Sequence, residues 1–170
     1  MIKGAAKLIN ALNGNVKKTQ IAAGFSWGLL LGLVPVGNAF WITLFFISFF
    51  FRHNHGAKIS ALAFVKIISP LFIYQLHALG EFILVDIQSL QPLFTTMYNM
   101  PFVPFTKFNN TLVMGGLSAG LLLYLPVFIS LILFIPFYRN YIAPKIRNSK
   151  FVKTISRLPL LSLIDKSLKG

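Results

Sequence analysis

The sequence predicts an all-α fold: a polytopic helical membrane protein with a broken, re-entrant hairpin near its N-terminus and amphipathic cytoplasmic tails. Three observations predict it. Hydrophobic residues make up 56% of the chain and charged residues only 11%, whereas about a quarter of a soluble domain is charged. Long charge-free stretches alternate with short basic segments, which is typical of membrane helices and their loops. The first of these stretches is interrupted at its centre by proline and glycine.

The interrupted stretch runs from Ile21 to Phe51, 31 residues without a charge, and is broken by Pro35-Val36-Gly37-Asn38. One crossing needs about 20 apolar residues, so the stretch is too long for a single plain span. Each arm has roughly fifteen residues, about 22 Å of helix, which is short for a crossing of its own. We therefore expect a re-entrant hairpin at 21–51, with two short crossings as the alternative. Non-helical backbone at membrane depth must be buried in protein or line a polar cavity, which makes Asn38 the candidate polar side chain of the tip.

The distribution of basic residues predicts the topology. Four precede Ile21, two lie in segment 52–58, one lies in segment 87–110, and eight follow from Arg139 onward. Cytoplasmic segments carry the excess of lysine and arginine. We therefore expect a bacterial inner (cytoplasmic) membrane protein with both termini in the cytoplasm, spans at 59–86 and 111–138, and an external loop at 87–110.

The two ends of the chain read as interfacial segments outside the helical membrane domain of residues 21–138. Segments 1–20 and 139–170 both alternate apolar and basic residues. Basic amphipathic helices bind anionic leaflets, and each basic residue contributes about 1 kcal/mol near the surface. We expect both tails to lie on membrane lipid at the cytoplasmic face.

Several functional classes are excluded by composition. The excess of 16 basic over 3 acidic residues could suggest nucleic-acid binding. However, the basic residues flank apolar runs, a distribution that indicates membrane topology and not a nucleic-acid-binding surface. Without cysteine there are no disulfides and no thiolate sites. His53 and His55 have no nearby carboxylate, so we expect no metal site. No nucleophile turn is present, so we expect neither an enzyme nor a cofactor.

The middle apolar segment contains the ionisable residues at membrane depth. Lys66 is followed by the helix-interrupting pair Ser69-Pro70, and His77 and Glu81 share a helical face. Buried charges in a membrane must be paired or hydrated and by default indicate function. A structural lysine–carboxylate pair, snorkelling to the two interfaces, a relay and lipid-headgroup contact all remain open. The candidate substrate- or lipid-binding residues are Asn38, Lys66, His77 and Glu81.

Residues 24–33 and 116–125 are identical at seven of ten positions. Each copy places small residues four apart, Gly24, Gly28 and Gly32 in the first and Gly116 and Gly120 in the second. Such spacing lets membrane helices approach closely. Chance similarity and a transporter-type repeat of broken helices are both compatible with the match.

The segment from Gln91 to Asn110 is rich in aromatic residues and proline. Aromatic residues at a membrane surface usually anchor to headgroups, but an external loop of this length also suggests a docking surface. The candidate partner-binding residues are Tyr98, Phe102, Phe105, Phe108, Asn109 and Asn110. Asn109, Asn110 and Thr111 also supply side chains that can cap the returning helix.

Two stretches of these residues resemble an uncharacterised bacterial inner-membrane family. The first is Ile21-Ala22-Ala23-Gly24-Phe25 with Gly28, Gly32, Pro35 and Gly37; the second, Met97-Tyr98-Asn99 with Phe108-Asn109-Asn110-Thr111-Leu112-Val113-Met114-Gly115, resembles one subfamily. The resemblance covers roughly residues 8–140. The family often has serine-proline where this chain has Lys17-Lys18-Thr19-Gln20, and asparagine-proline where it has Ser69-Pro70, so residue roles do not transfer. The resemblance implies no catalytic activity, and it implies an obligate larger envelope partner.

These features together predict a non-enzymatic inner-membrane component of an envelope complex that takes part in lipid handling or transport. Its expected partners are membrane lipids and a larger membrane-anchored or periplasmic protein. The alternative is a small-solute transporter or lipid translocase that uses the broken hairpin and the intramembrane lysine, histidine and glutamate.

Overall fold

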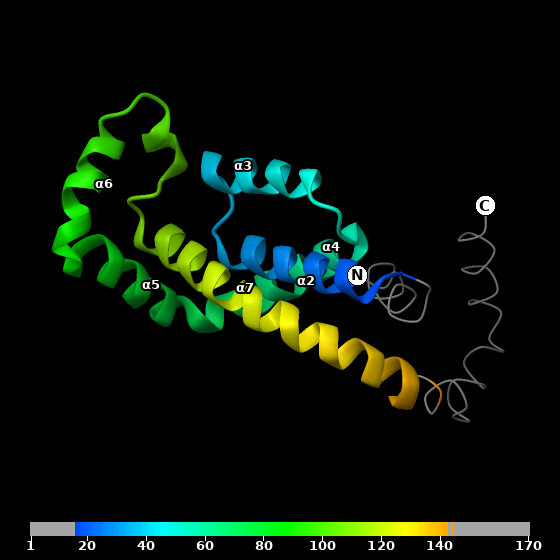
Figure 1. The fold of residues 1–170 in the computed structure, drawn as a ribbon. Helices are drawn as coiled ribbons and strands as arrows, with labels where there is room; N and C mark the ends of the chain where they lie inside the picture. The colour runs from blue at the N-terminus through cyan, green and yellow to red at the C-terminus, as the bar shows by residue number, and fades with distance from the viewer. Residues whose placement is uncertain (1–15, 143, 145–170) are drawn as a thin grey trace. The chain divides into compact units, whose positions relative to one another are not determined.

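The structure, a computed structural model, describes residues 16–142 and 144. Every regular element in this part of the chain is a helix, as the sequence predicts. The chain divides into two compact units, Met1–Ile132 and Leu133–Gly170. The amphipathic segments expected at 1–20 and 139–170 lie largely outside the described residues. The first unit contains the candidate site, and Figure 1 shows its helices.

The N-terminal apolar stretch folds as two helices that turn back on each other. Helix α2 (Lys18–Leu33) ends at Val34, and α3 (Ala39–Ile47) continues into a 3₁₀ turn (Ser48–Phe50). Between them Gly37 adopts φ +87°, which a side chain with a Cβ rarely tolerates. Figure 1 shows α3 running back along α2. The predicted break therefore occurs where the proline and glycine stand.

The next apolar stretch is one long helical path with a local interruption. Helix α4 (His55–Ile68) passes through a 3₁₀ turn (Ser69–Phe72) into α5 (Ile73–Glu81), which ends in a π-helical turn (Phe82–Asp86). Pro70 has no N–H, so the carbonyl of Lys66 loses its usual helical donor. The Ser69 hydroxyl lies 3.4 Å from that carbonyl as its donor. The interruption predicted at Ser69-Pro70 is confirmed.

Helices α2 and α4 run in the same direction and pack closely along the glycines of α2. A Cβ on Gly24 would collide with the Asn54 carbonyl, one on Gly28 with the Lys58 carbonyl, and one on Gly32 would lie 2.5 Å from the Val65 Cβ. The backbone N–H of Asn54 donates to the Gln20 carbonyl at 2.9 Å, so the two helices begin at the same level. The predicted packing role of these glycines is confirmed.

The segment between α5 and the last helix is more ordered than the expected loop. It contains a 3₁₀ turn (Gln88–Leu90), helix α6 (Gln91–Tyr98) and a second 3₁₀ turn (Val103–Thr106). Contacts join this second turn to α3. Phe102 and Lys107 flank the turn with positive φ angles of 71° and 54°. The chain then enters α7 (Thr111–Phe137), which ends in a π-helical turn (Tyr138–Ile142).

Helix α7 returns against both α5 and α2, again through glycines. A Cβ on Gly115 would collide with the Leu76 carbonyl, and Gly80 of α5 meets Thr111 in the same way. Further along, Gly116 meets Leu33 and a Cβ on Gly120 would lie 3.1 Å from the Leu30 Cα. The two copies of the internal repeat are thus both used for close helix packing.

Two continuous helical stretches, His55–Asp86 and Thr111–Ile142, are long and apolar enough to cross a membrane. Their mean hydropathy reaches 1.7 and 2.4, and only 17% and 11% of the most apolar windows are buried inside the protein. The core helix of a soluble protein would instead be mostly buried. Helix α3 has no buried residue at all. These helices therefore expose apolar surface on a scale unusual for a soluble chain.

Candidate functional site

The turn between α2 and α3, which we call the hairpin tip (residues 34–38), is built from polar contacts. Asn38 caps α3: its Oδ1 accepts from the Trp41 N–H at 2.8 Å, and its Nδ2 donates to the Pro35 carbonyl at 2.7 Å. The Trp41 indole N–H donates to the Leu31 carbonyl at 2.9 Å. Asn38 is itself buried. The sequence correctly indicated Asn38 as the polar side chain of the tip, and its amide is used at both ends to hold the turn.

Lys66 of α4 binds the hairpin tip directly. Its Nζ donates to the carbonyl of Val34 at 2.6 Å, and Val34 is the residue at which α2 ends. Carbonyls at a helix C-terminus have no helical donor and carry about half a negative charge together. The ammonium of Lys66 therefore caps α2 and compensates that partial charge.

A pocket of about 240 Å³ adjoins this contact. It lies between the end of α2, the interruption between α4 and α5, and the start of α7. Two of its lining residues, Pro70 and Ile73, are exposed, so the pocket opens at the surface of the unit. The side chains that line the pocket are apolar except for the ammonium of Lys66 and the hydroxyl of Ser69. The lining residues are Leu33, Pro35, Lys66, Ser69, Pro70, Ile73, Leu76 and Leu112.

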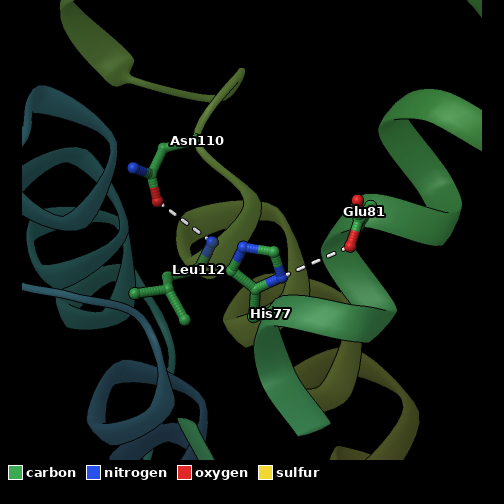
Figure 2. A network of polar contacts seen from close by, with 4 residues as sticks. All are labelled: His77, Glu81, Asn110 and Leu112. Carbon is green, nitrogen blue, oxygen red and sulfur yellow. Dashed lines mark hydrogen bonds and ion pairs between the residues drawn. The ribbon is translucent and has the colours of Figure 1, made fainter. Parts of the chain in front are cut away.

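Lys66 does not form the lysine–carboxylate pair that the sequence left open. In the described part of the chain, Glu81 pairs instead with His77, with 3.5 Å between Nδ1 and Oε2. Figure 2 shows this pair on one face of α5. Both side chains are about half exposed, so the pair contributes little to stability.

The structure does not bring together all four candidate binding residues. Asn38 and Lys66 both lie at the hairpin tip. His77 follows Lys66 by eleven residues, about 16 Å along the helix, and points to a different set of partners. A direct relay from Lys66 to His77 and Glu81 therefore has no continuous path among the described side chains.

Lys58 is a site residue that the sequence reasoning missed. The sequence places it at the end of the basic segment 52–58, between two apolar stretches, but it lies in the first turn of α4 and is fully buried. Its Nζ donates to the Ser48 hydroxyl at 2.8 Å and lies 3.9 Å from the ring centroid of Phe49 and 5.0 Å from that of Phe45. These contacts join the far end of the hairpin to α4. The sequence does contain one indication of this contact: Phe45 and Phe49 are four residues apart and precede a basic segment. A lysine ammonium can lie over the faces of two such rings.

His53 lies beside Lys58 in a cluster of rings. It is 8% exposed, stacks on Trp27 with 6.5 Å between centroids, and meets His55 edge-on at 4.6 Å. Burial first, and then the positive charges of Lys58 and His55, lower the pKa of His53 from 6.5 to about 4. The ring is therefore neutral at physiological pH, which suits a packing role. No group of three or more possible metal ligands occurs within residues 16–142.

The candidate partner-binding residues divide into two sets. Tyr98, Phe102, Phe105 and Asn109 are exposed, Phe102 by 80% and Phe105 by 70%. Phe108 is buried and packs on Phe94 at 6.1 Å. Asn110 caps α7: its Oδ1 accepts from the Leu112 N–H at 3.0 Å, which Figure 2 shows, and from the Val113 N–H at 3.2 Å. The capping role predicted for this segment is confirmed for Asn110.

Comparisons with known proteins are sparse. No family model and no solved structure matches the chain, so the resemblance to the inner-membrane family stays a prediction. The chain is 32% identical over 160 residues to an uncharacterized protein of Treponema pallidum (strain Nichols), and the match covers 94% of this chain and 98% of the relative. Similarity over nearly the full length of both chains indicates common descent and a shared fold. The chain belongs to the same family as this Treponema pallidum protein.

Proposed function

We propose that the chain is a non-enzymatic, polytopic component of the bacterial inner membrane that handles lipid within an envelope complex. In this proposal α2 and α3 form a re-entrant hairpin, α4–α5 and α7 cross the membrane, and both termini are cytoplasmic. A larger membrane-anchored or periplasmic protein is its partner.

The observation that carries the proposal is the level at which the hairpin turns. Helices α2 and α4 begin together at the Gln20–Asn54 bond, and the tip reaches only as far as Lys66. Lys66 is eleven residues after His55 and twenty before Asp86, which is about 16 Å and about 30 Å of helix. A hydrocarbon core is about 30 Å thick. If His55 lies near the cytoplasmic interface, the hairpin turns near the middle of the membrane.

The polar contacts of the tip support the same proposal. Backbone that leaves a helix at membrane depth must find partners inside the protein. The free carbonyls of Leu31, Val34 and Pro35 receive donors from Trp41, Lys66 and Asn38 respectively. A tip exposed to water would not need each of these donors, because water would supply them.

The proposed partner surface runs from the last residue of α6, Tyr98, to the start of α7. Tyr98, Phe102 and Phe105 are exposed there, and contacts join the turn that holds Phe105 to α3. Under the proposed topology this segment is external, within reach of a periplasmic protein or the outer headgroup layer. Exposed aromatic residues are enriched both at interfaces between proteins and in membrane interface belts.

The alternative, a solute transporter that relays through Lys66, His77 and Glu81, has less support. It needs these three side chains to communicate, and His77 lies about 16 Å further along the helix than Lys66. Handling of an amphiphile needs only the tip, the pocket and the surrounding bilayer.

The test is isolation of the protein from native membranes in polymer-bounded nanodiscs, followed by native mass spectrometry after release. We expect the chain to carry lipid and to co-purify with a larger envelope protein in fixed stoichiometry. The triple variant Tyr98→Ser, Phe102→Ser, Phe105→Ser should lose the larger protein and keep the lipid. A bare monomer without either companion would contradict the proposal.

A further inference from the structure

We propose that the pocket beside Lys66 binds the phosphate headgroup of an anionic phospholipid. In this proposal the ammonium of Lys66 donates to the phosphate, and the apolar lining contacts the first part of an acyl chain. This inference rests on the proposed function and names the substrate class of the same site.

The charge at the pocket requires an anion. The Lys66 ammonium has three N–H donors, and its bond to Val34 uses one. Of the two described acidic residues, Glu81 pairs with His77, and Asp86 lies twenty residues beyond Lys66, about 30 Å along the helical path. A cation in a membrane costs several kcal/mol unless it is paired or hydrated. The half charge at the end of α2 compensates it only in part, so an anionic group in the pocket completes the pairing.

The lining of the pocket favours a lipid over a small solute. Six of the seven other lining residues have purely apolar side chains, and the Ser69 hydroxyl already faces the Lys66 carbonyl. A site built for free phosphate would surround it with several donors, as helix N-termini and arginine clusters do. One ammonium with an apolar surround instead matches a molecule with one anionic group and a hydrocarbon tail.

The mouth of the pocket also suits a ligand that enters from the bilayer. Ile73 is exposed at the mouth, and its neighbours Leu71 and Phe72 are exposed by 74% and 48%. These are side chains that face lipid if α4–α5 crosses the membrane. An amphiphile can therefore reach Lys66 along the surface of α5 without passing through water.

The test measures lipid retention by the purified full chain in mild detergent, by native mass spectrometry. Phosphatidylglycerol, phosphatidylcholine and inorganic phosphate are the three probes. Both lipids offer a phosphate to Lys66, but phosphatidylcholine also carries a quaternary ammonium close to that phosphate. We expect phosphatidylglycerol to be retained about tenfold more strongly, because repulsion between the quaternary ammonium and the Lys66 ammonium costs roughly that factor. Inorganic phosphate should not displace it at millimolar concentration.

Three variants separate the charge from the fold. Lys66→Met should abolish the preference for phosphatidylglycerol, and Lys66→Arg should keep it. Lys107→Met removes the same charge from an exposed position and should leave the preference unchanged. Should Lys66→Met unfold through loss of its bond to Val34, Ile73→Trp fills the pocket with the lysine in place and should lower retention of the lipid.

Each remaining outcome overturns the inference. Equal retention of the two lipids by the wild type would show that the protein does not select an anionic headgroup. An unchanged preference in both Lys66→Met and Ile73→Trp would show that the lipid does not bind in the pocket. Displacement by inorganic phosphate alone identifies a free-anion site instead of a lipid site. None of these outcomes changes the co-purification of lipid and a larger protein with the chain from native membranes. Failure of this inference is therefore distinct from failure of the proposed function.

Discussion

At the scale of single residues, two lysines of α4 hold the helices of the first unit together. Lys66 caps the end of α2, and Lys58 joins α4 to the far end of α3 through Ser48 and Phe49. Neither ammonium has a carboxylate partner among the described residues. Carbonyls, a hydroxyl and aromatic faces replace it, which are the partners open to a cation where acids are scarce.

The bond between Lys58 and Ser48 should be measurable as a coupling. Removing a buried ammonium can itself be neutral or stabilising, so single variants are ambiguous. We expect Ser48→Ala to lower the free energy of unfolding by about 1–2 kcal/mol more in the wild type than in Lys58→Met. Unfolding in mixed micelles with increasing dodecyl sulfate measures it. In the control cycle Lys66→Met replaces Lys58→Met, and we expect no coupling with Ser48→Ala there. If Ser48→Ala costs as much in the Lys58→Met background as in the wild type, the contact between Lys58 and Ser48 is contradicted.

The buried ring of His53 should make stability depend on pH. Its pKa is about 4 in the folded chain against 6.5 ordinarily, so the unfolded chain takes up the proton first as the pH falls. The stability is complete above about pH 6.5 and is lost as the pH falls towards 4, by up to about 3 kcal/mol. Thermal unfolding at pH 7.5 and pH 4.5 measures the loss.

Two variants separate His53 from other titrating groups in that experiment. His53→Phe keeps a ring against Trp27 and should lose much of the drop in melting temperature between the two pH values. His55→Gln should keep most of it. A drop of the same size in His53→Phe and in the wild type would show that the ring is not the responsible group.

At the scale of elements, the helices depend on glycines placed where backbones meet. The close approach of α2 to α4 at Gly28 leaves no room for a Cβ, which would lie 2.7 Å from that of Ala61. The spacing of these glycines is visible in the sequence, and their packing role could be predicted from it. Which helix they meet could not, because that depends on the direction of the chain after the loop at 52–54.

Gly28→Ala therefore gives two opposite expectations. Helix propensity alone would stabilise α2 by about 1 kcal/mol, whereas overpacking against the backbone of α4 costs about 1–3 kcal/mol. We expect a net loss of stability, measured by unfolding in mixed micelles. Gly120→Ala, whose Cβ would have its nearest neighbours at 3.1 Å, should cost less. A variant at Gly28 that is as stable as the wild type would contradict the packing.

The sequence predicts the elements better than their contacts. The break at the hairpin tip, the interruption at Ser69-Pro70 and the cap at Asn110 each follow from local backbone chemistry, namely a missing N–H, a positive φ or an Asn side chain. The burial of Lys58 and Phe108 follows from contacts between distant segments. The bond from Lys66 to Val34 joins residues 32 positions apart, and no local pattern encodes it.

At the scale of the whole molecule, we propose that the first apolar stretch enters the membrane and turns back inside it. The supporting geometry is the common starting level of α2 and α4 and the position of the tip beside Lys66. Lipid handling and the role of Lys66 both depend on a tip at membrane depth, because a tip in water would leave the lysine hydrated and without need of an anion.

Cysteine accessibility tests that claim most directly, since the chain has no cysteine of its own. Single cysteines at Val36, Arg52 and Phe102, all exposed in the structure, are labelled in spheroplasts and in inside-out vesicles with a bulky membrane-impermeant maleimide. We expect Phe102→Cys to react only from outside, Arg52→Cys only from inside, and Val36→Cys from neither side, although it reacts once detergent is added. Labelling of Val36→Cys from outside as fast as Phe102→Cys would mean two full crossings and would contradict the re-entrant hairpin.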